Sequence, residues 1–367
     1  MATSQNLSPV TELFTKRLPK IELHAHLSGS ITRECLHEIW LRKKSHDPNF
    51  DLDDPWVLMP PGKVDYRVNI FFDVFSKMIY QLCNDVDSIL CATSAVLNDF
   101  KRDGVRYLEL RTTPREIRGH DGEIIVSKET YILTVLSAID AFRQDQTKAN
   151  NVDGMVVYLI LSIDRARDNP ESAMQVVDLA LKHRIYNENL AIIGIDLCGN
   201  PNKGDVSIFR SAFALARSEG LKITLHFAET LFSGEIKELE TLLSFAPDRL
   251  GHVIHVPDAI KEKITDRGIG LELCMSCNVH AKMIKGGFED HHFAYWLKTA
   301  CPLALCTDDV GFFCSPVSQE YFLAAKHFGL NRSDLIALCV RGVDAIFGGE
   351  NEKSRLRQLL EDFTLEG

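Results

Sequence analysis

Eight short apolar runs recur along the chain, and most of them are followed by a segment with helical periodicity. Short apolar runs bounded by polar segments are typical of buried strands. The runs comprise residues 20–27, 105–111, 155–163, 191–197, 222–227, 249–255, 270–274 and 303–307. Helical patterns lie between them at residues 128–142, 170–183, 206–218, 236–245 and 258–265. Because strands that alternate with helices form parallel sheets, eight such units predict an α/β fold, the (β/α)₈ TIM barrel.

Further helices are expected on both sides of the strand-rich region. Helical spacing marks residues 32–44, 70–82 and 86–100, the polar stretch 45–63 is expected to be a loop, and residues 324–365 are expected to be closing helices. We find no linker or repeat, so residues 1–367 are expected to form a single barrel domain with extra N-terminal and C-terminal helices. The doubly wound alternative usually carries a glycine-rich phosphate turn, and neither G-x-G-x-x-G nor G-x-x-x-x-G-K-[ST] occurs.

Composition indicates which class of ligand the protein binds and in which cellular compartment it is found. A formal net charge of -10 argues against binding to the nucleic-acid backbone and favours a small-molecule substrate. Ten cysteines without a regular framework indicate reduced thiols in the cytosol. The first twenty residues lack a signal-peptide core, and no run approaches eighteen apolar residues. We therefore expect a cytoplasmic protein that acts as a monomer, without a nucleic-acid or membrane partner.

Polar side chains follow nearly every predicted strand, which is where a barrel builds its active site. His24 and His26 are two residues apart on the first strand, so both project to the same face. His226 and one carboxylate of Asp308 and Asp309 would complete a set of three nitrogens and one oxygen, suited to zinc with room for a water. Singly, each residue has an ordinary explanation as a core histidine or a helix cap.

Two further groups are expected beside this metal site. Glu229 stands three residues beyond His226 and reaches the same cavity as a candidate general acid. His252, at the end of the next strand, is a candidate base or orienter of the metal-bound water. Zinc lowers the pKa of such a water towards about 7. The combination predicts hydrolysis.

Taken together, these motifs resemble the adenosine deaminase family along essentially the whole chain. The resemblance rests on His-Ala-His-Leu at residues 24–27, Gly199, His-x-x-Glu at 226–229, Arg-x-Gly-His at 249–252 and Thr-Asp-Asp at 307–309. Finer features are similar to the adenosine deaminase-like branch, whose members deaminate N6-methyl-AMP. These features are residues 107–115, Ser-Ile-Asp-Arg around Asp164, Asp-His-His-Phe at 290–293 and Ser-Gln-Glu-Tyr at 318–321.

The resemblance implies one zinc ion per chain and a role for each matching residue. Zinc would be held by His24, His26, His226 and Asp308. Glu229 would donate a proton to purine N1, and His252 would hold and deprotonate the attacking water. Asp309 would bind purine N7, the Gly199 amide would bind N3, and His26 and Ser28 would lie beside the substrate. The products would be an inosine-type compound and ammonia or methylamine.

A phosphate site is expected just past the second strand. Thr112, Thr113, Pro114 and Arg115 place hydroxyls and a guanidinium where they can hold a monophosphate. Asp164 is expected either to contact the ribose or phosphate edge or to pair with Arg111 or Arg165.

Three positions depart from the branch. Ser28 stands where Asn is usual, Tyr80 where His is expected, and Val253 where a small residue is common. These departures concern substrate recognition, so a deaminase of free adenosine or 2'-deoxyadenosine stays as the alternative. Ser28 and Tyr80 still offer hydroxyls to a substrate.

Other chemistries fit the sequence less well. Cys274-x-x-Cys277 lacks the H-x-E and the proline of a cytidine-type zinc site, so we expect buried thiols. His291 and His292 lack a third metal ligand nearby and are expected to form a lid or a structural element. A two-metal hydrolase would need a bridging lysine at a strand end, which is absent. A binding module without catalysis would have lost a metal ligand or the acid, and all are present.

Overall fold

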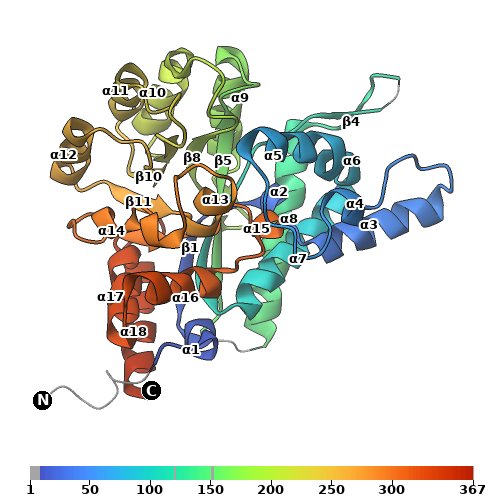
Figure 1. Ribbon diagram of the computed structural model, residues 1–367. Coiled ribbons are helices and arrows are strands. Elements are labelled where there is room, and N and C mark those ends of the chain that lie inside the picture. Colours follow the sequence, from blue (N-terminus) through green and yellow to red (C-terminus); the bar gives the residue numbers. More distant parts are fainter. Residues whose placement is uncertain (1–8, 120, 150–152, 367) are drawn as a thin grey trace, which may run out of the picture.

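The computed structural model describes residues 9–119, 121–149 and 153–366, and within them eight parallel strands form one sheet (Figure 1). The strands follow one another in chain order, and each pairs with the next. They are β1 (Lys20–His26), β2 (Val105–Thr112), β5 (Val156–Asp164), β8 (Ile192–Cys198), β9 (Lys222–Phe227), β10 (Arg249–His252), β11 (Gly270–Leu273) and β12 (Leu303–Leu305). All eight predicted strands are confirmed, although the runs 249–255 and 303–307 extend beyond their strands.

The first and last strands meet, so the sheet closes into a barrel. Ala25 and Asp308 form a parallel bridge. The His26 N–H donates to the Asp308 carbonyl at 3.0 Å, and the Asp308 N–H donates to the His24 carbonyl at 2.8 Å. Closure therefore brings Asp308 beside the two histidines of β1, although 282 positions separate it from His26 in the sequence. The predicted (β/α)₈ barrel is confirmed.

Helices surround the barrel, and both chain ends add more (Figure 1). The crossover helices are α7 (Val86–Arg102), α8 (Lys128–Lys148), α9 (Pro170–Lys182), α10 (Arg210–Ser218) after the 3₁₀ turn η3 (Val206–Phe209), α11 (Ile236–Ser244) and α12 (Asp258–Asp266). The N-terminal α1 (Glu12–Arg17) packs against α16 (Val317–Phe328), which is followed by α17 (Arg332–Val343) and α18 (Glu350–Glu366). The expected extra helices at both ends are present, and the last group begins earlier than residue 324.

A helical insertion follows β1 on one side of the barrel mouth (Figure 1). It comprises α2 (Leu27–Ser30), α3 (Arg33–His46), α4 (Pro55–Leu58), α5 (Val68–Val74), a π-helical turn η2 (Phe75–Ile79) and α6 (Tyr80–Leu82). The stretch 45–63 was expected to be a loop, but it contains α4. The Asp54 side chain accepts the Trp56 N–H and Pro55 suits the first helical turn, which explains this helix.

Short elements complete the fold. Two hairpins lie outside the barrel sheet, β3 (Ile117–Arg118) with β4 (Ile124–Val126) and β6 (Ile185–Tyr186) with β7 (Asn189–Leu190). Near the barrel mouth the chain forms α13 (Met275–His280), η4 (Phe288–Asp290), α14 (Phe293–Trp296) and α15 (Val310–Phe313). In the described part of the chain, no helix combines the length and apolar character that crossing a bilayer requires. Residues 1–8 of the segment searched for a signal peptide lie outside the described residues.

Candidate active site

Three histidines and one aspartate converge at the carboxyl ends of the strands. His24 Nε2 lies 3.2 Å from His226 Nε2, and His26 Nε2 lies 3.0 Å from the same nitrogen. Asp308 Oδ1 lies 3.5 Å from His24 Nε2 and 3.4 Å from His26 Nε2. Ligands about 2.0–2.1 Å from a tetrahedral zinc ion are about 3.3 Å apart. Four of the six distances among the predicted ligand atoms are therefore close to this spacing, and the ligand atoms of His24, His226, His252 and Asp308 also lie within 4.8 Å of one another.

Two imidazole tautomers show that this cluster suits a cation. His24 Nδ1 lies 2.6 Å from Glu272 Oε2, and His226 Nδ1 lies 3.2 Å from Asp196 Oδ1. Because a carboxylate accepts hydrogen bonds, each ring carries its proton on Nδ1. The Nε2 lone pairs of His24 and His226 then face each other at 3.2 Å, an arrangement that a bound cation would stabilise.

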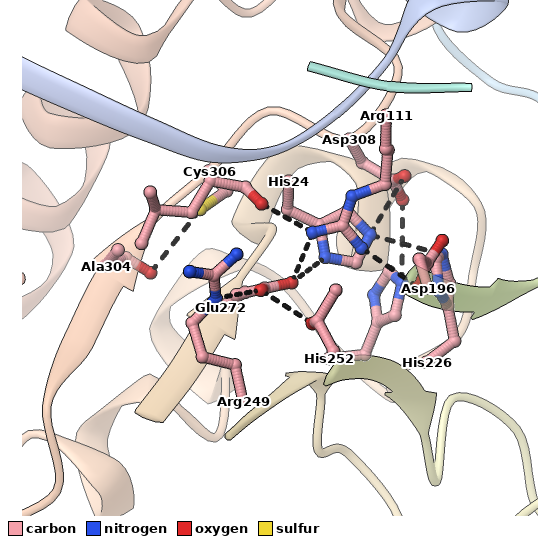
Figure 2. Close-up of polar contacts among 12 residues, drawn as sticks. His24, Arg111, Asp196, His226, Arg249, His252, Glu272, Ala304, Cys306 and Asp308 are labelled. Carbon is pink, nitrogen blue, oxygen red and sulfur yellow. Dashed lines mark hydrogen bonds and ion pairs between the residues drawn. The ribbon is translucent and has the colours of Figure 1, made fainter. Parts of the chain in front are cut away.

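Two arginines anchor the carboxylates behind the histidines (Figure 2). Arg111 lies 3.3 Å from Asp196 and 2.8 Å from Glu272, and Arg249 Nε lies 2.6 Å from Glu272 Oε1. Burial alone would raise the pKa of Asp196 and Glu272, but Arg111 beside them holds both pKa values below their ordinary range. Both carboxyls are therefore ionised and accept from the histidines. Arg111 pairs with these residues rather than with Asp164.

Glu229 is a buried carboxyl that lines the cavity. Its side chain is buried, and burial raises the pKa of its carboxyl to about 7. Among the described residues, its Oε2 has no hydrogen-bond partner. A carboxyl that is protonated near neutral pH and faces a cavity without a protein partner is free to donate to a substrate.

His252 and Asp308 lie in strained backbone at the strand ends. His252 has φ 63°, Val253 φ 48° and Asp308 φ 61°, a left-handed conformation that non-glycine residues adopt rarely and often at functional sites. His252 Nε2 lies 3.7 Å from Asp308 Oδ2 and has no hydrogen-bond partner among the described residues. Burial lowers the pKa of His252 to about 3, so its ring is neutral.

The Asp309 carboxyl is buried and lies against Gly29, which has no side chain. Burial and the neighbouring Asp308 raise the pKa of Asp309 well above its ordinary value, which favours its protonated form. A Cβ at Gly29 would lie 1.4 Å from Asp309 Oδ1. Gly199 has φ 98°, and a Cβ there would lie 2.2 Å from Asp164 Oδ1. Both glycines therefore keep side-chain carbon out of the site.

A cavity of about 230 Å³ opens onto these groups and collects most of the predicted substrate contacts. Its walls include His26, Ser28, Tyr80, Thr112, Thr113, Asp164, Gly199, His226, Glu229, Asp308 and Asp309. Pro114 and Arg115 lie instead on an adjoining cavity of about 410 Å³, which shares Tyr80, Thr113 and Asp164 with the first. His24 and His252 are fully buried behind the cavity wall.

Two cations at the cavity are absent from the sequence prediction. Arg167 and Lys203 both line it, from the loops after β5 and β8. The guanidinium carbons of Arg115 and Arg167 lie 4.0 Å and 5.4 Å from the centre of the Tyr80 ring. Asp164 Oδ2 lies 3.7 Å from Arg167 Nε, whereas Arg165 pairs with Glu238. The only sequence signal for Arg167 and Lys203 is that each follows a strand end closely.

The cysteine pair belongs to the scaffold of the site. Cys274 and Cys277 are both buried, as expected, and burial raises the pKa of both thiols well above the ordinary value. The Cys277 thiol donates to Asp308 Oδ2 at 2.9 Å. Cys277 therefore helps to orient Asp308, a contact that the sequence did not indicate.

The fold and this site define a (β/α)₈ enzyme with a group of His and Asp side chains that could hold a metal ion. Comparison with known proteins makes the class specific. Residues 19–363 match the family model for adenosine deaminase. The chain is 37% identical to the N6-methyl-AMP deaminase of Danio rerio, over 95% of each chain, and 33% identical to that of Homo sapiens, over 98% of this chain and 97% of the relative.

A solved structure agrees with these relatives. The structure of Arabidopsis ADAL complexed with IMP superimposes with a TM-score of 0.84 at 34% identity, over 97% of this chain and 99% of that chain. The chain belongs to the adenosine deaminase family, and the relatives indicate a deaminase. The resemblance seen in the sequence is therefore confirmed.

Proposed function

We propose that this protein is a zinc-dependent hydrolytic deaminase that converts N6-methyl-AMP, and other N6-alkyl AMP, to IMP and the corresponding amine. One observation carries the proposal: a single cavity is lined both by residues of the metal-ligand cluster and by hydroxyl and cationic groups. Supporting this, the Danio rerio and Homo sapiens relatives are named N6-methyl-AMP deaminases, and a structural neighbour is a complex with IMP.

The donor set fits zinc. His24, His26, His226 and Asp308 would hold one ion per chain, and Asp196 and Glu272 fix two of the rings in the tautomer that presents Nε2. When bound, zinc supplies a water whose pKa is lowered towards neutrality. The protein's own residues would bind and orient the substrate and supply the proton.

Three groups would recognise and activate the purine. Glu229 holds a proton near neutral pH and would donate it to N1, which makes the carbon bearing the amine a better electrophile. Asp309 is protonated and would donate to N7, a ring nitrogen that only accepts. The Gly199 N–H would donate to N3, with no side chain in the way. His252 would hold the water that attacks the ring.

The opposite side of the cavity would hold the phosphate. Thr113 offers a hydroxyl, while Arg167 and Lys203 offer charged donors to a phosphoryl group. Arg115 would act from the adjoining cavity, stacked on Tyr80. A free nucleoside has no phosphate for these cations to bind, which is why the nucleotide is proposed in preference to adenosine.

Product analysis tests this function. Zinc-loaded protein incubated with N6-methyl-AMP should release IMP and methylamine in equal amounts, detected by chromatography and mass spectrometry. The Glu229→Gln variant with an equal zinc content serves as the control. Formation of inosine from adenosine, with no IMP from N6-methyl-AMP, would instead establish the nucleoside deaminase.

A further inference from the structure

The two adjacent histidines of the Asp-His-His-Phe motif lie directly behind His252. His292 Nε2 donates to the His252 carbonyl at 2.6 Å, and Trp296 Nε1 donates to the Val253 carbonyl at 3.3 Å. These bonds support the backbone where His252 and Val253 are left-handed. His291 is linked instead to the imidazole of His252, through the side chain of Asn278.

Three hydrogen bonds connect His252, Asn278, His291 and the backbone of Phe293. The Asn278 side chain bridges the two rings, with Oδ1 3.0 Å from His252 Nδ1 and Nδ2 3.0 Å from His291 Nε2. The backbone N–H of Phe293 donates to His291 Nδ1 at 3.0 Å. His252, Asn278 and His291 are at most 1% exposed, so water does not compete for these bonds.

Each donor in this series of hydrogen bonds must face an acceptor, and one placement of the protons satisfies that requirement. A backbone N–H only donates, so His291 Nδ1 accepts, and burial lowers the pKa of His291 well below its ordinary value and keeps the ring neutral. The proton of His291 is then on Nε2, which requires the oxygen of the Asn278 amide. The oxygen and nitrogen of an amide are assigned from their partners, so we assign the reverse orientation, with the oxygen toward His291 Nε2 and the NH₂ toward His252 Nδ1. His252 Nδ1 accepts, and the ring proton of His252 is on Nε2.

We propose that Asn278, held by His291, is a positioning residue that keeps the proton of His252 on Nε2. His252 then donates a hydrogen bond to the oxygen of the attacking water instead of removing its proton. The Nε2 atom has no protein partner among the described residues and lies 3.7 Å from Asp308 Oδ2, beside the metal-ligand cluster. This inference rests on the proposed function for the identity of the water, and on the hydrogen bonds together with a neutral His291 for the tautomer.

Nitrogen-15 NMR of the histidine rings tests the tautomer without any assay of activity. The zinc-loaded protein is labelled at its histidine nitrogens, and the signals that disappear in His252→Gln identify His252. We expect a protonated, pyrrole-type signal at Nε2 and an unprotonated, pyridine-type signal at Nδ1. The opposite pattern would overturn the proposal. If the tautomer is as expected but N6-methyl-AMP is not deaminated, the proposed function fails and the positioning role stands.

A substitution at Asn278 separates positioning from mere packing. Asn278→Asp has nearly the same shape, but its carboxylate accepts from both rings and so moves the His252 proton to Nδ1. We expect kcat to fall about 10-fold to 100-fold with KM nearly unchanged, and the NMR pattern of His252 to reverse. Asn98→Asp, on the exposed face of α7, adds the same charge as a control. Unchanged kcat with a reversed pattern would overturn the proposal, and zinc content with melting temperature identifies a misfolded variant.

Discussion

His24 and Glu272 are 248 positions apart in the sequence, yet His24 Nδ1 lies 2.6 Å from Glu272 Oε2 inside the barrel. This bond fixes the proton of His24 on Nδ1 and directs Nε2 at the metal-ligand cluster. Glu272 in turn bonds to Arg111 and Arg249, and all four side chains are buried (Figure 2). The geometry of the site therefore depends on an ion network in the barrel interior.

Replacing Glu272 by Gln should weaken metal binding. The amide keeps the shape but loses the charge that holds the His24 tautomer and satisfies two arginines. We expect the zinc affinity to fall about 10-fold to 100-fold, measured by competition with a chelator. Glu240→Gln, on exposed α11, is the control. An unchanged zinc affinity would contradict the role assigned to Glu272.

Replacing Glu229 by Gln should remove the proton donor and leave the metal bound. We expect kcat on N6-methyl-AMP to fall about 10²-fold to 10⁴-fold, which is the usual contribution of general acid catalysis. Zinc content, measured by elemental analysis, should equal that of the wild type. Turnover at the normal rate would exclude Glu229 from this role.

Replacing Arg167 by Ala, or Lys203 by Met, should weaken binding of the phosphate selectively. Loss of a charged hydrogen bond costs about 1.5–3 kcal/mol, so KM for N6-methyl-AMP should rise about 10-fold to 100-fold. KM for N6-methyladenosine should stay within about twofold. Arg115→Ala should have a smaller effect, because Arg115 lies on the adjoining cavity. Equal effects on nucleotide and nucleoside would place the phosphate elsewhere.

Replacing Glu320 by Gln should change how stability depends on pH. Burial raises the pKa of Glu320 from 4.5 to about 7, so the folded state binds its proton more tightly than the unfolded state. Its contribution to stability is complete below pH 4.5 and is lost as pH rises to about 7, by up to about 3 kcal/mol. The melting temperature of Glu320→Gln relative to the wild type should therefore increase between pH 5 and pH 8. A constant difference would contradict the raised pKa.

The barrel and the convergence of the candidate metal ligands were predictable because their signals are local. Apolar runs mark the strands, and His24, His26 and His226 stand at strand ends where a barrel builds its site. Glu272 and Asn278 carry no such signal, because their partners are set by the register and closure of the barrel. Arg111 illustrates the same point, since the sequence offered Asp164 as its partner and the structure provides Asp196 and Glu272.

The helical insertion was less predictable. Its residues 70–82 have helical spacing, but the structure divides them among α5, a π-helical turn and α6, which places Tyr80 against Arg115. Such a turn depends on packing against the barrel mouth, and a periodicity of 3.6 residues does not reveal it. Arg167 and Lys203, which we propose to bind the phosphate, lie in loops, where no periodicity exists to place a side chain.

One comparison tests the central claim most directly: kcat/KM of the zinc-loaded protein on adenosine, AMP, N6-methyladenosine and N6-methyl-AMP, followed by the ultraviolet change on deamination. The account predicts that N6-methyl-AMP exceeds N6-methyladenosine by at least about 10-fold to 100-fold, the contribution expected of the phosphate contacts. It also predicts that N6-methyl-AMP exceeds AMP. A preference for free adenosine would contradict the account and would make Thr113, Arg167 and Lys203 part of the scaffold.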